Sequence, residues 1–128
     1  RFGANGNGVM GIGGWNADAP ALKAYLKRHT EVTGREPDRW ASPITYASLQ
    51  VLQQAIERVG KLDRAAVIKE IHNGTFKTII GDVKLKDGLL QEVWAVGQWQ
   101  DGEFYGLAPM NYAGARQAVT PKSAWKAQ

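Results

Sequence analysis

Residues 45–56 read Thr-Tyr-Ala-Ser-Leu-Gln-Val-Leu-Gln-Gln-Ala-Ile, and this segment carries the strongest signal about the fold. Apolar side chains recur in it at three- and four-residue spacing, which is typical of an amphipathic helix. The pattern extends from about Ser42 to Val59, and Gly60 follows at a position where helices commonly end. We expect a well-buried helix here, with an inner face made of Thr45, Ser48, Leu49, Leu52, Ala55, Ile56 and Val59.

Two further helices are predicted on either side of this segment. The first runs from about Ala19 to Thr33, where Asp18 is placed to cap the helix and Pro20 suits the first turn, in which an amide hydrogen is not needed. The third is shorter: Asp63 is its expected cap, and Asn73–Gly74 is its expected end.

Beyond Gly74 the apolar period falls to about two, which indicates strands. Short strands are expected at Phe76–Ile80 and Val83–Lys86, and Asp87-Gly88 is a turn signal. The clearest hairpin joins Val93–Gln100 to Glu103–Leu107, because the intervening Asp-Gly pair suits the positive φ angles of a tight turn.

The N-terminal residues are rich in Gly and Asn, which favours a loop. Val9, Met10 and Ile12 follow and predict a short buried strand. The glycines at positions 6, 8 and 11 match a dinucleotide-binding fingerprint in spacing, but that motif has to follow a strand and open a helix. Here a strand-like run comes after the glycines, so we expect a loop and the start of a strand.

The composition is that of an ordinary globular protein, with 44% apolar and 22% charged residues in a chain of 128. The net charge is +4, yet the 16 Lys and Arg residues are scattered among 12 acidic ones and form no long basic run. This pattern favours a solvated surface over a nucleic-acid interface. The chain starts at Arg1 and has no apolar segment of membrane-spanning length, so we expect a processed, truncated or excised piece.

The residues that would support catalysis or metal binding are sparse. The chain has no Cys, which excludes thiol nucleophiles and thiolate ligands, and its two histidines, His29 and His72, fall on different predicted helices. No nucleophile-elbow motif is present. We therefore expect neither an enzyme nor a bound cofactor or metal.

Three segments of the chain form a distinctive combination. They are Gly8–Trp15 with the following helix to Pro37, then Thr45–Ile56, then Thr75–Val83 with Asp87-Gly88 and Val96–Gly102. Together they resemble the type I periplasmic-binding fold, in particular leucine/isoleucine/valine-binding proteins. The segment Thr45–Ile56 is the most specific, and in it Ser48 stands where the family usually has Ala. The resemblance covers nearly all of this chain but only the last third of a typical member.

The resemblance implies an α/β chain that forms the C-terminal third of a two-lobed fold with three-layer α/β/α lobes and is incomplete on its own. Residues 1–15 would be a strand and loop of lobe II, and residues 16–90 the helices and short strands of lobe I. Residues 91–108 would be the closing hairpin of lobe II, and 109–128 a C-terminal tail. The missing N-terminal portion, or a complementing chain, is then an expected partner.

The function implied by the resemblance is that of a periplasmic or extracytoplasmic solute-binding protein. Such a protein captures an amino acid, or a similar small aromatic or aliphatic acid, by hinge closure and delivers it to an ABC permease in the membrane. Two alternatives stay open: a ligand-sensing receptor domain of the same fold, and a basic nucleic-acid-binding α/β domain.

The candidate ligand residues also follow from the resemblance. Trp40, Ala41 and Ser42 match the loop that lines the ligand cleft in relatives, and Tyr46 and Trp15 complete the set. Structural roles compete with this interpretation: core packing for Trp40, a helix cap for Ser42, and packing or a hinge contact for Tyr46. The groups that hold the ligand carboxylate and ammonium would lie upstream of Arg1, so tight binding by this chain alone is not expected.

Overall fold

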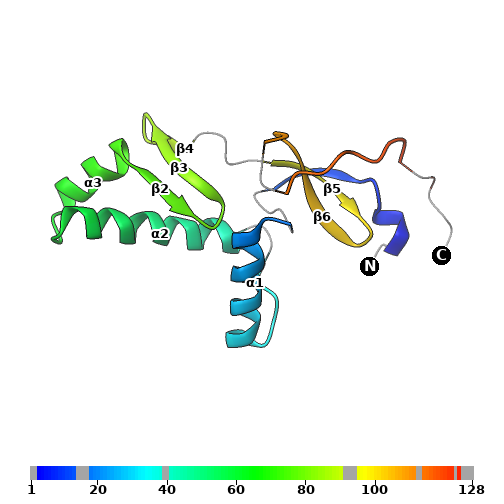
Figure 1. Cartoon of the computed structure of the whole chain (residues 1–128), viewed down its shortest axis with the longest axis horizontal. Coiled ribbons are helices and arrows are strands. Elements are labelled where there is room, and N and C mark those ends of the chain that lie inside the picture. Colours follow the sequence, from blue (N-terminus) through cyan, green and yellow to red (C-terminus); the bar gives the residue numbers. More distant parts are fainter. Residues whose placement is uncertain are drawn as a thin grey trace. The chain divides into compact units, whose positions relative to one another are not determined.

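The computed structural model describes residues 3–13, 18–38, 41–90, 95–111, 114–122 and 124 (Figure 1). The chain divides into two compact units: unit 1 comprises Arg1–Glu36 and Trp94–Gln128, and unit 2 comprises Pro37–Val93. The predicted lobe boundaries at residues 15, 90 and 108 stay a prediction.

Unit 2 is a helical layer packed on a small antiparallel ribbon. The chain forms α2 (Ala41–Val59), α3 (Arg64–Asn73), β2 (Thr75–Thr78), β3 (Gly81–Lys86) and β4 (Leu89–Leu90). The strands lie in the order β2-β3-β4, and α2 and α3 pack on the ribbon. Asp63 accepts a hydrogen bond from the backbone N of Ala66 (3.0 Å), which confirms the predicted cap of α3.

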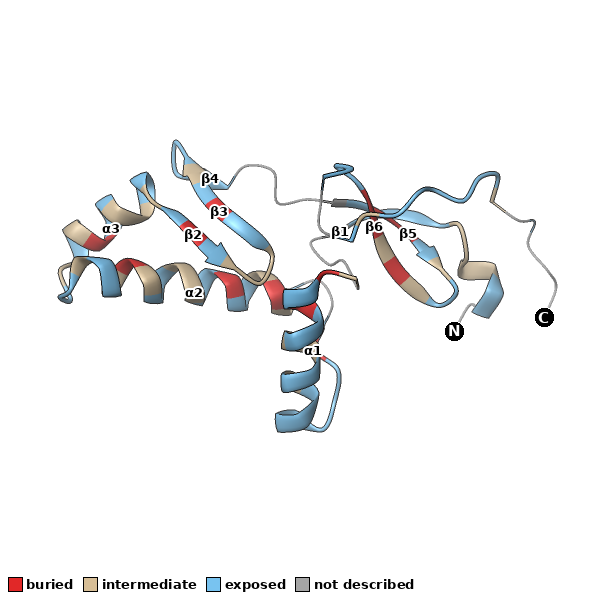
Figure 2. Cartoon of the chain, viewed as in Figure 1, coloured by how far each residue is buried: buried red, intermediate tan, exposed pale blue. Residues whose placement is uncertain are grey.

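The core of unit 2 lies between the helices and the ribbon. Phe76 is fully buried at its centre and clusters with Ala55, Val67 and Val83. Figure 2 shows these buried positions on α2, α3, β2 and β3. The half-buried residues that pack around the cluster are Val51, Ile56, Val59, Ile71 and Ile80.

The predicted inner face of α2 is partly wrong. Leu49 is 60% exposed and Leu52 is 43% exposed, and Thr45 and Ser48 are exposed as well. The buried positions are Pro43, Ala47 and Ala55, which follow one another at intervals of four and eight residues along one side of the helix. The middle of α2 is apolar on most of its circumference, so spacing alone did not identify the side that packs.

Unit 1 contains a three-stranded antiparallel sheet. A short 3-10 helix, Gly3–Gly6, leads into β1 (Met10–Gly13); α1 (Pro20–Thr33) follows, and β5 (Ala95–Gln100) and β6 (Glu103–Ala108) form the hairpin. The strand order is β1-β5-β6. Asp101 and Gly102 have φ angles of 52° and 87°, which confirms the predicted hairpin turn.

The expectation that the first strand is buried is wrong. Met10 is 50% exposed and Ile12 is 61% exposed. These two side chains project from the same face of β1, and the described residues leave much of that face uncovered. The apolar run predicted a strand correctly, but it did not show how much of that strand is covered.

Gln98 ties the C-terminal tail to the sheet of unit 1. Its side chain is fully buried, and its Nε2 donates to the carbonyl oxygens of Gly8 (3.2 Å) and Val119 (3.0 Å). Its Oε1 accepts from the backbone N of Val119 (2.8 Å) and from Gln100 Nε2 (3.0 Å). These contacts satisfy both donors and the acceptor of a buried amide, which would otherwise oppose folding.

Candidate functional site

The candidate ligand residues that the structure describes lie at the start of α2. Ala41 is the first residue of this helix and is exposed, and Ser42 is half-buried in the same turn. Tyr46 follows one turn later and is 45% exposed. Trp15 and Trp40 lie outside the described residues, so their place in the site stays a prediction.

The N-terminal end of α2 is capped by a carboxylate. Asp38 Oδ1 accepts a hydrogen bond from the backbone N of Ala41 at 2.6 Å, so Asp38 supplies a cap at this position. Such a cap satisfies one of the free amide groups of the first turn and places a negative charge at the positive end of the helix. A ligand carboxylate would have to compete with Asp38 there, so contact through side chains suits this end of α2 better.

Beside this end, unit 2 carries an apolar groove of about 250 Å³. Among the described residues that line it, Ser48 is the single polar one, and its hydroxyl donates to the carbonyl oxygen of Ile44 (2.9 Å). The groove therefore offers apolar contact but no charged group for an amino acid's carboxylate or ammonium. Its lining residues are Ile44, Ala47, Ser48, Val51, Leu52, Ile71, Ile80, Val83, Leu85 and Leu90.

Among the described residues, no three or more His, Cys, Asp or Glu side chains gather in a way that could hold a metal ion. His29 lies near the end of α1, with its Nδ1 3.1 Å from both Thr33 Oγ1 and the carbonyl oxygen of Arg35. His72 lies in α3 of unit 2. Within the same described residues, no helix combines the length and the apolar character needed to cross a bilayer.

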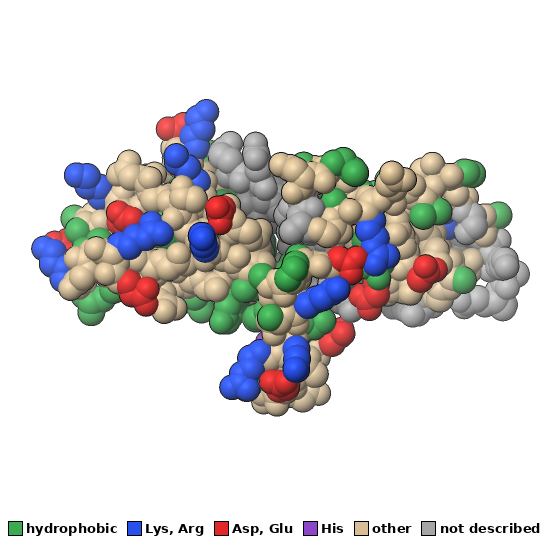
Figure 3. All heavy atoms as spheres, viewed as in Figure 1, with side chains coloured by type: hydrophobic (Ala, Val, Ile, Leu, Met, Phe, Trp, Pro, Cys, Tyr) green, Lys and Arg blue, Asp and Glu red, His purple; other side chains and the backbone are tan. Residues whose placement is uncertain are grey.

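Basic side chains are interspersed with acidic ones on the described surface, as Figure 3 shows for one face. Many of the cations pair with acids, which leaves little reason to assign a nucleic-acid interface. The ion pairs are Lys23–Asp18, Lys27–Glu31, Arg28–Glu31, Arg58–Glu70, Lys61–Asp63 and Arg116–Asp18.

Asp18 does not cap α1 as predicted. The residue at the cap position is Ala19, without a side-chain hydrogen bond, and Asp18 instead forms ion pairs. Its Oδ2 lies 2.7 Å from Arg116 Nε and 2.6 Å from Nη2, and its Oδ1 lies 3.2 Å from Lys23 Nζ. The Arg116 guanidinium also stacks 3.4 Å from the centre of the Tyr105 ring. Burial opposes ionisation of Asp18, but the hydrogen bonds and positive charges of Arg116 and Lys23 outweigh it and lower the pKa of this carboxyl.

The Asp18→Asn variant should lose stability only where Asp18 is ionised. A carboxyl whose pKa is lower in the folded than in the unfolded chain stabilises the fold above the ordinary aspartate pKa of about 3.9, and this contribution disappears as the pH falls through the lowered value. We expect wild type to be more stable than Asp18→Asn near neutral pH and the difference to vanish in acid. Urea denaturation across this pH range tests the expectation. Asp101→Asn, which removes the same charge in the β5–β6 turn, is the control. If the loss of stability depended on pH equally in the two variants, the role given to Asp18 would be wrong.

Sequence reasoning missed the groups that organise unit 1. Asp18 and Arg116 are 98 residues apart in the chain, and no local pattern relates them. The signal that could have suggested a role for Gln98 is its place within an alternating strand, where a polar residue occupies a position that the sheet buries.

A family model described as periplasmic binding protein matches residues 2–103 of the chain. Among solved structures, a leucine-binding protein from Thermotoga maritima is similar with a TM-score of 0.62 at 23% identity, over 80% of this chain and 31% of that protein. An ABC-transporter solute-binding protein from R. palustris, solved in complex with benzoate, has a TM-score of 0.67 at 19% identity, over 92% of this chain and 34% of that one. No curated protein sequence matches the chain.

A third solved structure extends the comparison to almost the whole chain. A leucine-, isoleucine-, valine-, threonine- and alanine-binding protein from Brucella ovis, in a closed conformation, has a TM-score of 0.68 at 21% identity, over 98% of this chain and 36% of that one. At these identities the solved structures establish a common fold. The chain spans about a third of the length of each of them.

Proposed function

This chain belongs to the periplasmic binding protein family, and on that premise we propose that the protein it comes from captures an amino acid or a similar small carboxylate for an ABC importer. The resemblance noted in the sequence and the α/β fold class are both confirmed, with the chain covering part of a type I periplasmic-binding fold. A solute-binding role outside the cytoplasm follows from the family; the ligand and the permease belong to the proposal.

The observation that carries the proposal is the family match over residues 2–103. Two features of unit 2 are compatible with it. The first turns of α2 carry the half-buried Ser42 and the exposed Tyr46, and a separate part of the surface of α2 lines the apolar groove. An apolar groove suits the side chain of an apolar amino acid or the ring of an aromatic acid. The charged groups of the ligand would be held by residues outside this chain.

In this proposal, Trp40, Ala41, Ser42, Tyr46 and Trp15 contact the ligand when the lobes of the full-length protein close around it. No bond is made or broken, so the protein acts by binding and release. The site is completed by the N-terminal portion of the same protein or by a complementing chain.

A thermal-shift screen of the full-length protein against leucine, isoleucine, valine and benzoate tests the proposed function. A ligand present at 100 times its Kd is expected to add about 2.7 kcal/mol of stability. If neither these compounds nor a wider panel of amino acids and small aromatic acids stabilises the protein, the assignment is wrong.

The role of Trp40 is tested by substitution in the full-length protein. Because a tryptophan that packs on a ligand contributes about 2 kcal/mol or more to binding, Trp40→Ala should weaken affinity about 30-fold in calorimetric titrations. Trp40→Phe keeps an aromatic ring and should retain most of the affinity. Wild-type affinity in Trp40→Ala would remove this residue from the site without affecting the assignment of the function.

A further inference from the structure

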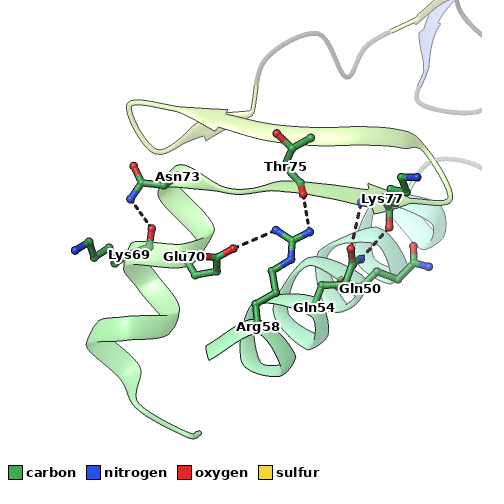
Figure 4. Close-up of polar contacts among 8 residues, drawn as sticks. All are labelled: Gln50, Gln54, Arg58, Lys69, Glu70, Asn73, Thr75 and Lys77. Carbon is green, nitrogen blue, oxygen red and sulfur yellow. Dashed lines mark hydrogen bonds and ion pairs between the residues drawn. The ribbon is translucent and has the colours of Figure 1, made fainter. Parts of the chain in front are cut away.

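One edge of β2 has no neighbouring strand among the described residues, and side chains of α2 bond its backbone instead (Figure 4). Gln54 Nε2 donates to the carbonyl oxygen of Lys77 (2.9 Å), and the backbone N of Lys77 donates to Gln54 Oε1 (3.2 Å). The other edge of β2 pairs with β3 in antiparallel register. In a larger sheet, the backbone of Lys77 would bond to the next strand on this side. Here the side chain of Gln54 takes that place.

Two further side chains of α2 bond the backbone at the start of β2 and just beyond its end. Arg58 Nη2 donates to the carbonyl oxygen of Thr75 (2.8 Å), and Gln50 Oε1 accepts from the backbone N of Ile79 (2.9 Å), the first turn residue after the strand. The helix residues are four apart and their backbone partners two apart, and the two series run in opposite directions. We call Gln50, Gln54 and Arg58 the side-chain ladder.

The ladder is possible because four residues of helix and two residues of strand cover nearly the same length. Four residues of α-helix rise about 6 Å, and two residues of strand rise about 6.7 Å. Three successive turns of α2 can therefore meet three successive outward-facing backbone positions, with side-chain flexibility absorbing the small mismatch. The glutamine carboxamide has one acceptor oxygen and an N–H donor, as a peptide group has, so Gln54 pairs with Lys77 as a strand residue would.

Arg58, the last of the three ladder residues, also links the ladder to the core of unit 2. Arg58 Nη1 donates to Glu70 Oε1 of α3 (3.1 Å), and the guanidinium lies 4.6 Å from the centre of the Phe76 ring. Gln54 Nε2 is further held by the carbonyl oxygen of Gln50 (3.0 Å). Arg58 and Gln54 are thus held by further contacts and do not depend on β2 alone.

We propose that the side-chain ladder blocks the edge of β2 and so keeps it from pairing with a strand of a second copy of this chain. An edge strand with free N–H and C=O groups is a template for intermolecular pairing. Residues 75–79 include three β-branched residues and the aromatic Phe76, all of which favour strands. The ladder occupies the same backbone groups that a partner strand would use. Its hydrogen bonds therefore have to break before such a strand can pair. This inference does not depend on the identity of the ligand.

The test compares Gln50→Ala/Gln54→Ala with Gln53→Ala in the full-length protein. Gln53 is the matched control, because its Nε2 donates to Glu57 Oε1 on the same helix (2.8 Å) and it is not one of the ladder residues. In dilute solution, the amides of Lys77 and Ile79 should exchange hydrogen at least tenfold faster in the double variant than in wild type or Gln53→Ala. At rising concentration, light scattering should detect dimers or larger species of the double variant only.

A further substitution tests whether the dimers form through the edge of β2. Adding Lys77→Pro to the double variant removes the N–H at the centre of the exposed edge, and proline is tolerated at an edge position whose N–H faces outward. The protein should then return to a monomer. If the double variant does not fold, Gln54→Ala alone is measured in the same way. Unchanged exchange at Lys77, a double variant that stays monomeric, or dimers that persist with Pro at position 77 would each overturn the proposal.

Discussion

Phe76→Ala is expected to destabilise unit 2 by about 3–5 kcal/mol, the cost of removing a large aromatic side chain from a packed core. Phe76 is fully buried, it contacts the buried residues around it from α2, α3 and β3, and Arg58 covers its ring. Surrounding atoms cannot move easily into the space, because the side-chain ladder fixes the position of α2 against β2. Since whole proteins are stable by about 5–15 kcal/mol, this loss should be evident as a large fall in the urea midpoint of the full-length protein.

Leu62→Ala is the matched control for this prediction. Leu62 lies in the loop between α2 and α3 and is 87% exposed, so its truncation should change stability by no more than about 0.5 kcal/mol. Similar losses in the two variants would mean that the hydrophobic centre of unit 2 is not where Phe76 lies. Hydrogen exchange of the α2 and β3 amides would show in addition whether unit 2 opens separately from the rest of the protein.

Elements whose signals are local could be predicted from the sequence. The three helices were predicted to within two residues at their ends, and the Asp-Gly turns were predicted from residue type alone. Asp87 and Asp101 have φ angles of 53° and 52°, in the left-handed region that Asp tolerates better than most residues. A turn or a cap depends on a few neighbouring residues, which the sequence displays directly.

Burial and partner choice could not be predicted in the same way. Leu49, Leu52, Met10 and Ile12 have the residue type of a core but are exposed here, because the side of an apolar segment that is covered depends on which distant residues reach it. Polar contacts over long separations were missed for the same reason. Gln54 and Lys77, or Asp18 and Arg116, are brought together by the fold and not by any spacing in the chain. Ala41, Ser42 and Tyr46 share one short segment at the start of α2, and their role in a ligand site stays a prediction, as does that of Trp15 and Trp40.

Gly97→Ala should destabilise unit 1 by about 1–3 kcal/mol, the usual cost of overpacking. A Cβ atom at this position would lie 2.4 Å from two carbons of the Phe104 ring and 2.7 Å from the carbonyl oxygen of Tyr105. The ring lies over the bare glycine backbone, an arrangement that shields a glycine within a sheet. Phe104 is 9% exposed and packs edge-on against Trp99, so the ring has little room to move away. The measurement is again urea denaturation of the full-length protein.

Gly11→Ala is a demanding control, since Gly11 is the direct partner of Gly97 in the neighbouring strand. A Cβ at Gly11 would meet the same ring only at 3.9 Å, an ordinary contact, so the variant should lie within about 0.5 kcal/mol of wild type. Phe104→Leu combined with Gly97→Ala should cost less than the sum of the single changes, because the smaller side chain relieves part of the clash. Equal losses at the two glycines, or strict additivity with Phe104→Leu, would contradict the close packing of the ring on Gly97. Gly97 is therefore required by a contact that forms only when β5 and β6 pair, which explains why a small residue stands in the middle of an otherwise good strand.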